Sequence, residues 1–201
     1  MKLTNIKYKA NYYALLILAF VIPLERRLLA PAIILFLITS LLNYSKDLKS
    51  KKSLLLFTVI YVYYGISVMF VENTSIGLAD LTTKLSLLLL PLSFFISNLD
   101  LNKSLIPFFT AFIEGCVVVI GLSLINTLLL FYFSMDISLF FYKGITLYMH
   151  PSYLAMMLSM AMSILYYYLF NKNDSFRFSP KLSIVLILSL IHISEPTRQK
   201  P

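Results

Sequence analysis

A histidine and a tyrosine stand at the entrance to a long apolar run. Residues 146–163 read TLYMHPSYLAMMLSMAMS, with His150 directly before Pro151 and Tyr153 three residues further on. Proline disfavours helical backbone at the preceding residue and suits the first helical position, so we expect a helix to begin at Pro151. His150 would then lie beside unpaired N–H groups, where a neutral imidazole can accept a proton or donate a hydrogen bond. Tyr153 would share its side of the helix, where it can orient the ring.

The same segment also permits a structural interpretation. A histidine at a membrane boundary can serve only to anchor a helix among lipid headgroups. Beyond it, Ala155, Ser159 and Ser163 recur every four residues. Such a face of small residues predicts the close approach of another helix.

A pair of arginines lies between the first two apolar runs, at Arg26 and Arg27 in LERRLL. We expect them in a tight turn that faces outward. Guanidinium groups bind phosphate oxygens in pairs, so these two residues are candidates for binding a diphosphate. Arginines that flank a membrane helix also reach for headgroups, and this anchoring role is the alternative.

Glu114, in FIEGCVVVIG, is the carboxylate that lies inside an apolar run. In hydrocarbon a carboxylate is protonated, paired or solvated. Helical spacing places Glu114 near Ala111, Gly115 and Gly121, the face that we expect to pack against neighbours. It is either a structural hydrogen-bonding residue or part of a proton or substrate path. The expected topology places it towards the cytoplasmic end of its helix.

The sequence indicates neither a metal site nor a cofactor. Cys116 is the single cysteine and lies in an apolar run, which excludes a disulfide framework and a thiolate cluster. The methionine cluster fits helix packing better than a metal path, which needs several thioethers facing one pore; it comprises Met156, Met157, Met160 and Met162.

Composition points to a bilayer as the solvent of this chain. Of its 201 residues, 59% are hydrophobic and 13% are charged, whereas a soluble domain has roughly 25% charged residues. The net charge of +8 is spread over short loops, so it indicates membrane topology rather than binding to nucleic acid. No signal-peptide cleavage motif follows the first apolar run. We therefore expect an all-α, polytopic transmembrane helix bundle.

Apolar runs separated by polar loops define the expected spans. A span needs about 20 apolar residues, and the chain predicts six spans plus a truncated seventh that begins at Leu182. The fourth run is short and contains Pro91, and the fifth is long enough to tilt, break or leave the bilayer. The segment 72–84 is polar and is expected along the outer interface, as a connector or as a cover for a glycan cavity. The six runs are 10–24, 28–44, 54–71, 85–97, 105–134 and 151–170.

Orientation follows from the lysines and arginines of alternate loops, because the richer set belongs in the cytoplasm. The richer set contains Lys2, Lys7, Lys9, Lys46, Lys49, Lys51, Lys52, Lys103, Lys172, Arg177 and Lys181. The poorer set contains Arg26, Arg27, Lys84 and Lys143. The N-terminus is thus expected in the cytoplasm, and His150 at the outer mouth of the sixth helix.

Three stretches, taken in order, resemble one family. HPSYLAMML resembles the His-Pro-x-Tyr segment that opens a central helix in the O-antigen ligase and polymerase-like family. The stretches IPLERRLLAPAIILFLITSLL and TKLSLLLLPLSFF fit the same family. The resemblance covers most of residues 10–187, which correspond to about the first half of a typical member.

The resemblance implies a multi-pass glycosyltransferase of the bacterial inner membrane. Such a protein moves a glycan from undecaprenyl diphosphate to a lipid A core or glycan acceptor on the outer face, without metal or nucleotide. His150 and Tyr153 would then be candidate catalytic residues, and Arg26 and Arg27 candidate substrate-binding residues. The family's large outer loop with its catalytic histidine has no match here, so no residue is transferred from it.

Two alternatives stay open. A transporter or flippase would give Glu114 the central role and leave His150 incidental, and a break within a helix at the bilayer midplane would favour it. The other is a fragment that is inactive on its own. Leu188–Arg198 matches the translation of a transposase-type sequencing adapter residue for residue. We therefore expect a membrane domain over 1–187 and a non-native tail over 188–201.

Overall fold

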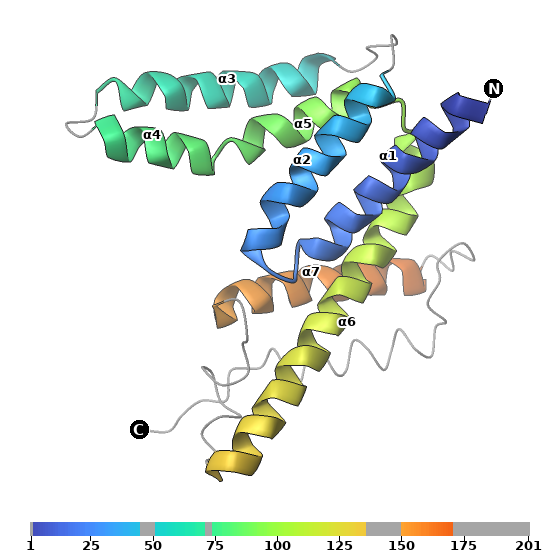
Figure 1. Ribbon diagram of the computed structural model, residues 1–201, viewed down its shortest axis with the longest axis vertical. Helices are drawn as coiled ribbons and strands as arrows, with labels where there is room; N and C mark the ends of the chain where they lie inside the picture. The colour runs from blue at the N-terminus through green and yellow to red at the C-terminus, as the bar shows by residue number, and fades with distance from the viewer. Residues whose placement is uncertain (1, 45–50, 71–73, 136–149, 171–201) are drawn as a thin grey trace. The chain divides into compact units, whose positions relative to one another are not determined.

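The computed structural model describes residues 2–44, 51–70, 74–135 and 150–170, and these are helical with short connections (Figure 1). The prediction of an all-α fold is confirmed for them. Tyr44 and Ser97 form an isolated antiparallel bridge. The expected seventh run and the tail at 188–201 lie outside the described residues. The helices are α1 (Lys2–Val21), α2 (Arg26–Leu42), α3 (Lys51–Val68), α4 (Thr74–Thr83), α5 (Ser86–Ile96), α6 (Leu101–Ser134) and α7 (Pro151–Phe170).

The apolar runs predicted most helix positions well. The run 151–170 coincides with α7, and 85–97 lies within a residue of α5 at either end. Helix α1 begins at Lys2 instead of near residue 10, because its polar first turns are helical as well. The long run 105–134 forms α6, which continues from Leu101 to Ser134 with Pro107 inside it. The run therefore forms one helix and does not break.

The segment 72–84, expected along the outer interface, is helical over most of its length. Its residues from Thr74 onward form helix α4, and α5 follows almost directly. The two together make a 23-residue apolar helix, Thr74–Ile96. The polar side chains of this segment had suggested a connector, but they do not prevent helix formation over Thr74–Thr83.

The expectation of six spans and a seventh is met only in part. Among the described residues, two helices are long and apolar enough to cross a membrane, Thr74–Ile96 and Asn102–Ser134. Two shorter apolar helices accompany them, Arg27–Leu42 and Leu56–Val68.

The chain divides into two compact units, the first formed by residues 1–18 and 30–100 and the second by 19–29 and the chain from 101 onward. In the first unit, α1 and α2 pack along buried stripes with helical spacing. Phe36 of α2 meets Phe94 of α5 edge to face, with ring centroids 5.0 Å apart. Helix α3 lies alongside the row formed by α4 and α5 (Figure 1). The two stripes consist of Asn11, Ala14, Leu15 and Leu18, and of Ala32, Ile33, Phe36, Thr39 and Ser40.

In the second unit, α6 packs against α7. The buried stripe of α7 consists of Leu154, Leu158, Ala161, Leu165 and Tyr168. Ala155, Ser159 and Ser163, which were expected to let another helix approach, lie outside this buried stripe. The hydroxyls of both serines donate to carbonyls of their own helix, to Met156 O at 2.8 Å and to Ser159 O at 2.9 Å, and both residues are exposed.

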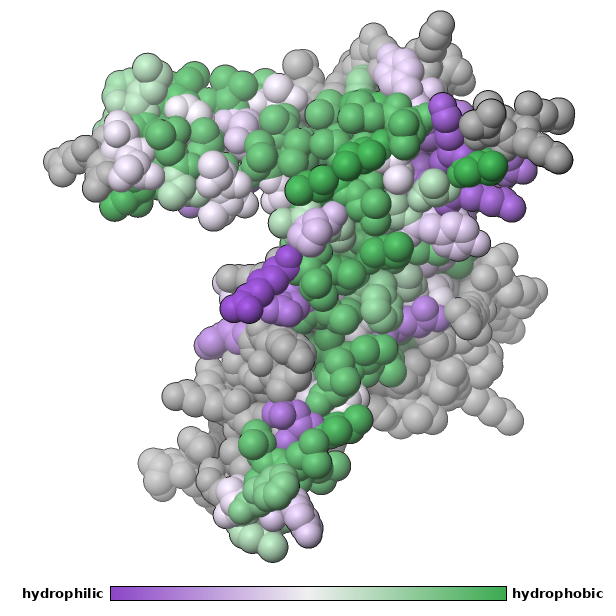
Figure 2. Space-filling view, viewed as in Figure 1, coloured by the Kyte–Doolittle hydropathy of each residue, from purple (hydrophilic) through white to green (hydrophobic). Residues whose placement is uncertain are grey.

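Much of the exposed surface is apolar, while several polar side chains are buried. Figure 2 shows apolar residues over most of the coloured part of the visible face. Exposed residues include Val59, Val62, Ile76, Leu122, Ile125 and Leu128. Buried polar residues include Asn11, Ser40, Ser93, Ser104, Ser123 and Thr127. A surface this rich in exposed apolar side chains, around a core that also contains polar ones, is not the arrangement that water selects.

Candidate functional site

His150 lies directly before α7 and caps its start. Its carbonyl accepts hydrogen bonds from the N–H groups of Tyr153 at 3.0 Å and Leu154 at 3.3 Å. The Nδ1 atom of its ring accepts the N–H of Ser152 at 3.4 Å and lies 3.1 Å from the Ser152 hydroxyl. The predicted helix start at Pro151 is confirmed. Because Nδ1 accepts this N–H, a neutral His150 ring carries its proton on Nε2.

Tyr153 lies beside His150, as the helical spacing predicts. The two ring centroids are 6.4 Å apart, and the ring planes meet at 79°. Both side chains are exposed. An imidazole and a phenol thus lie together at the first turn of α7, where a bound hydroxyl group could reach either.

Arg26 and Arg27 form the first turn of α2 rather than the tight turn itself, which covers residues 22–25. The Arg27 side chain is 91% exposed, and its Nε lies 3.5 Å from Oε1 of Glu25. Glu25 also accepts the N–H of Leu28 through its carbonyl, at 3.2 Å. Part of the Arg27 charge is thereby offset by a neighbouring carboxylate. The side chain of Arg26 lies outside the described part.

Glu114 lies on α6 directly before a close contact with the turn that precedes α2. A Cβ placed on Gly115 would be 2.3 Å from Phe20 O and 2.7 Å from Pro23 Cγ. Glu114 is therefore next to the point where α6 meets the end of α1 and the turn that follows it. The predicted packing face holds at Ala111 and Gly115, which are buried, but at Gly121 a Cβ would meet nothing within 4 Å.

The five candidate residues all belong to the second unit. Among the described contacts, His150 meets Tyr153, Arg27 meets Glu25, and Gly115, next to Glu114, lies against Phe20 and Pro23. Among the described residues, no group of three or more histidines, cysteines and carboxylates is placed to hold a metal ion.

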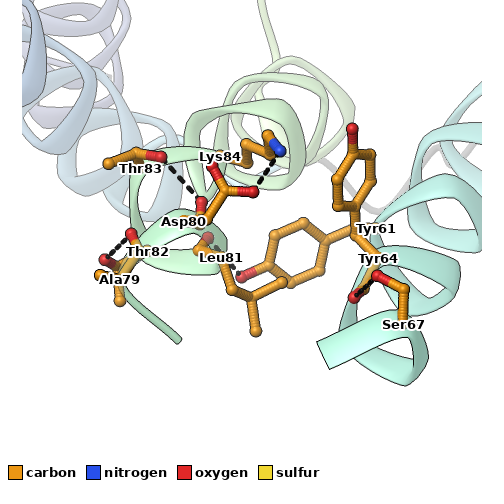
Figure 3. A network of polar contacts seen from close by, with 9 residues as sticks. All are labelled: Tyr61, Tyr64, Ser67, Ala79, Asp80, Leu81, Thr82, Thr83 and Lys84. Carbon is orange, nitrogen blue, oxygen red and sulfur yellow. Dashed lines mark hydrogen bonds and ion pairs between the residues drawn. The ribbon is translucent and has the colours of Figure 1, made fainter. Parts of the chain in front are cut away.

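A second polar cluster, which sequence reasoning did not single out, joins α3 to α4 in the first unit (Figure 3). Lys84 Nζ forms an ion pair with Asp80 Oδ2 one helical turn earlier. The same ammonium lies 4.0 Å from the ring centroid of Tyr64. The Tyr61 hydroxyl donates to the carbonyl of Leu81 at 3.5 Å. The i, i+4 spacing of Asp80 and Lys84 was visible in the sequence, but their aromatic partners on α3 were not.

The junction between α4 and α5 is a local break in the helical hydrogen-bond pattern. The N–H of Leu85 donates to Thr82 O at 3.2 Å and that of Leu87 to Lys84 O at 2.9 Å, each three residues back instead of four. The Leu81 carbonyl, which an unbroken helix would pair with Leu85, accepts the hydroxyl of Tyr61 instead.

A buried polar node connects α1, α2 and the end of α5 in the first unit. Asn11 Nδ2 donates to Ser97 Oγ at 2.6 Å, and its Oδ1 accepts the hydroxyls of Ser40 at 3.1 Å and Thr39 at 3.3 Å. The N–H of Asn98 donates to the carbonyl of Asn43 at 3.0 Å. No local pattern predicts this node, because its partners come from distant parts of the sequence.

Over the part of the chain that the structure describes, these features define a helical fold with an apolar exterior, buried polar contacts, and two helices long and apolar enough to cross a membrane. The chain matches no protein-family model, no curated protein and no solved structure.

Proposed function

We propose that this chain is embedded in the bacterial inner membrane as a multi-pass protein, with six spans, a seventh from Leu182 and a cytoplasmic N-terminus. The apolar exterior supports this placement, because lipid tails cover such a surface and water does not. The polar node supports the proposal that the start of the first apolar run and the ends of α2 and α5 lie on the same side of the membrane. Asn11 near the start of the apolar run 10–24, Asn43 after α2 and Ser97 after α5 lie together, and the lysine and arginine count assigns these same chain segments to one side.

We further propose that the protein is a glycosyltransferase of the O-antigen ligase or polymerase type. In this reaction an acceptor hydroxyl oxygen attacks the anomeric carbon of the glycan. The bond from that carbon to undecaprenyl diphosphate breaks, and the diphosphate leaves with the electron pair. The acceptor proton passes to a base, and no metal or nucleotide takes part. The acceptor is a lipid A core or a second glycan.

The observation that carries this proposal is the placement of His150 at the start of α7, with its ring beside Tyr153. In the proposed reaction His150 either receives the acceptor proton or holds the donor in position, and Tyr153 orients the ring or contacts a sugar. Receipt of the proton at Nδ1 would cost the bond from the N–H of Ser152. Arg26 and Arg27 begin α2 at the same expected outer surface and bind the diphosphate there.

The test replaces His150 and measures glycan transfer from an undecaprenyl diphosphate-linked donor in membranes that contain equal amounts of the protein. A group that moves a proton contributes about 10²–10⁴-fold in rate, so His150→Ala should lower transfer by this factor. His150→Gln keeps hydrogen bonding without basicity and separates positioning from proton transfer. Near-normal transfer by His150→Ala would assign His150 to headgroup anchoring and refute its catalytic role.

A transporter or flippase is the second candidate, and one observation favours it. The apolar helix Thr74–Ile96 has a break at Lys84–Leu85 with an ion pair beside it, and broken helices with freed carbonyls form substrate sites in many transporters. In that case Glu114 carries the function. Glu114→Gln would then abolish movement of a labelled lipid across vesicles, whereas His150→Ala would leave it unchanged.

A further inference from the structure

The cluster of Tyr61, Tyr64, Asp80 and Lys84 presents one positive and one negative group side by side. Lys84 and Asp80 lie one turn apart on the same side of their helix, and the ion pair fixes their positions. Their side chains are 35% and 54% exposed, so both remain accessible from outside. The Tyr64 ring holds the ammonium from the side of α3.

The cluster lies where the character of the helix changes from mixed to apolar. Helix α4 contains Thr74, Ser75, Asp80, Thr82 and Thr83 among its ten residues, whereas α5 begins SLLLLPLSFF. Opposite the cluster, α3 carries three tyrosines in YVYY, and tyrosines gather at membrane–water boundaries. Lysines reach for headgroups at the same level. Under the membrane placement proposed above, Lys84 directly precedes the fourth run, 85–97, and therefore lies with Asp80 among the lipid headgroups of the outer leaflet. Because Tyr64 contacts Lys84, α3 then leaves the hydrocarbon near Tyr64, before the expected end of its run at residue 71.

We infer that this cluster binds the zwitterionic headgroup of a phospholipid, of the phosphoethanolamine type. Lys84 donates to the phosphate oxygens. Asp80 accepts from the ammonium at the other end of the headgroup, and the open edge of the Tyr64 ring packs against the ethanolamine carbons. The inference rests on the membrane placement and does not depend on glycan transfer.

Charge complementarity is what selects this headgroup. An anionic headgroup would meet Lys84 favourably but would also meet the carboxylate of Asp80, which repels it. A zwitterion turned so that its two charges oppose those of the protein is attracted at both ends, and the ion pair within the protein is kept. A charge-assisted hydrogen bond contributes about 1.5–3 kcal/mol, which is roughly a 10- to 100-fold change in affinity.

The experiment counts lipids bound to the purified protein by native mass spectrometry, with phosphatidylethanolamine or phosphatidylglycerol added at matched concentrations. Lys84→Gln and Asp80→Asn each remove one charge and keep a polar side chain of similar size. Each should lower binding of phosphatidylethanolamine about tenfold. Asp80→Asn should instead leave or increase binding of phosphatidylglycerol. Lys103→Gln, which changes an exposed lysine on α6, is the matched control and should change neither.

Further arms separate the possible outcomes. Circular dichroism identifies any variant that loses helix. If Lys84→Gln or Asp80→Asn does so, Tyr64→Leu replaces it in the binding measurement, and we expect Tyr64→Leu to weaken phosphatidylethanolamine binding. Soluble phosphoethanolamine should compete only weakly, because it lacks the acyl chains; full competition would show a site for free phosphate esters and overturn the lipid assignment. A different outcome is that Lys84→Gln lowers the binding of both lipids equally while Asp80→Asn has no effect. That result would show that the site binds only the phosphate, and it would overturn the zwitterion assignment. Unchanged binding in both variants would refute the site, while the His150 transfer assay tests the glycosyltransferase separately.

Discussion

The carbonyl oxygen of Phe20 lies directly against Gly115, at 2.3 Å from the place that a Cβ on residue 115 would take. A side chain at this position would push against backbone, which cannot rotate away. We expect Gly115→Ala to destabilise the second unit by about 1–3 kcal/mol, as overpacking does. Gly121→Ala is the matched control on the same helix, since a Cβ there meets nothing within 4 Å. It should be neutral or stabilise by about 0.5–1 kcal/mol. Thermal unfolding in detergent, followed by circular dichroism, measures both, and equal melting temperatures would contradict the close contact.

Replacement of Asn11 should destabilise the first unit. Asn11 is fully buried and its side chain bonds to Ser97, Thr39 and Ser40. Asn11→Ala leaves these groups without their partner, at a cost of about 1–3 kcal/mol. Asn98→Ala is the control, because Asn98 is exposed and its backbone N–H remains to bond Asn43. A loss of stability that is the same in both variants would argue against a specific node.

The buried stripe of α7 can be tested against the face that the small residues suggested. Ala161 is fully buried and Ser163 is exposed. Ala161→Leu should overpack the α6–α7 contact and destabilise it by about 1–3 kcal/mol. Ser163→Leu should change stability by no more than about 0.5 kcal/mol. The reverse order in chemical denaturation would restore the small-residue face as the contact.

The proposed topology predicts which residues react with a membrane-impermeant thiol reagent added to intact cells. In a Cys116→Ala background, Met69→Cys, between α3 and α4, should be labelled from outside. Lys103→Cys, at the start of α6, should be labelled only after the cells are opened. Both positions are exposed, so labelling reports the side of the membrane. Labelling of position 103 in intact cells would refute the orientation and the placement of His150.

Sequence reasoning predicted the helices well and their partners poorly, for one physical reason. Long apolar runs are bounded by polar residues, which fixes the ends of α5 and α7 within a residue or two. A helix that is apolar all round has no periodic face, so the contact side of α7 could not be read from Ala155 or Ser159. The cap geometry of His150 was predictable because it is local. The node at Asn11 and the tyrosines beside Lys84 depend on residues distant in the sequence.

Under the proposed membrane placement, the polar node at one end and the charges of Arg27 and Lys84 at the other determine how thick a layer of lipid tails the first helices can match. From Arg27 to Asn43 is 16 residues along α2 and its end, about 24 Å at 1.5 Å per residue, and from Lys84 to Ser97 is about 20 Å. The hydrocarbon layer of a typical bilayer is about 30 Å thick. In a membrane, lipids beside these helices must therefore compress by several ångströms, at a cost of fractions of a kcal/mol per Å. The protein should gather short-chain lipids around itself and reconstitute more readily in thin bilayers than in thick ones.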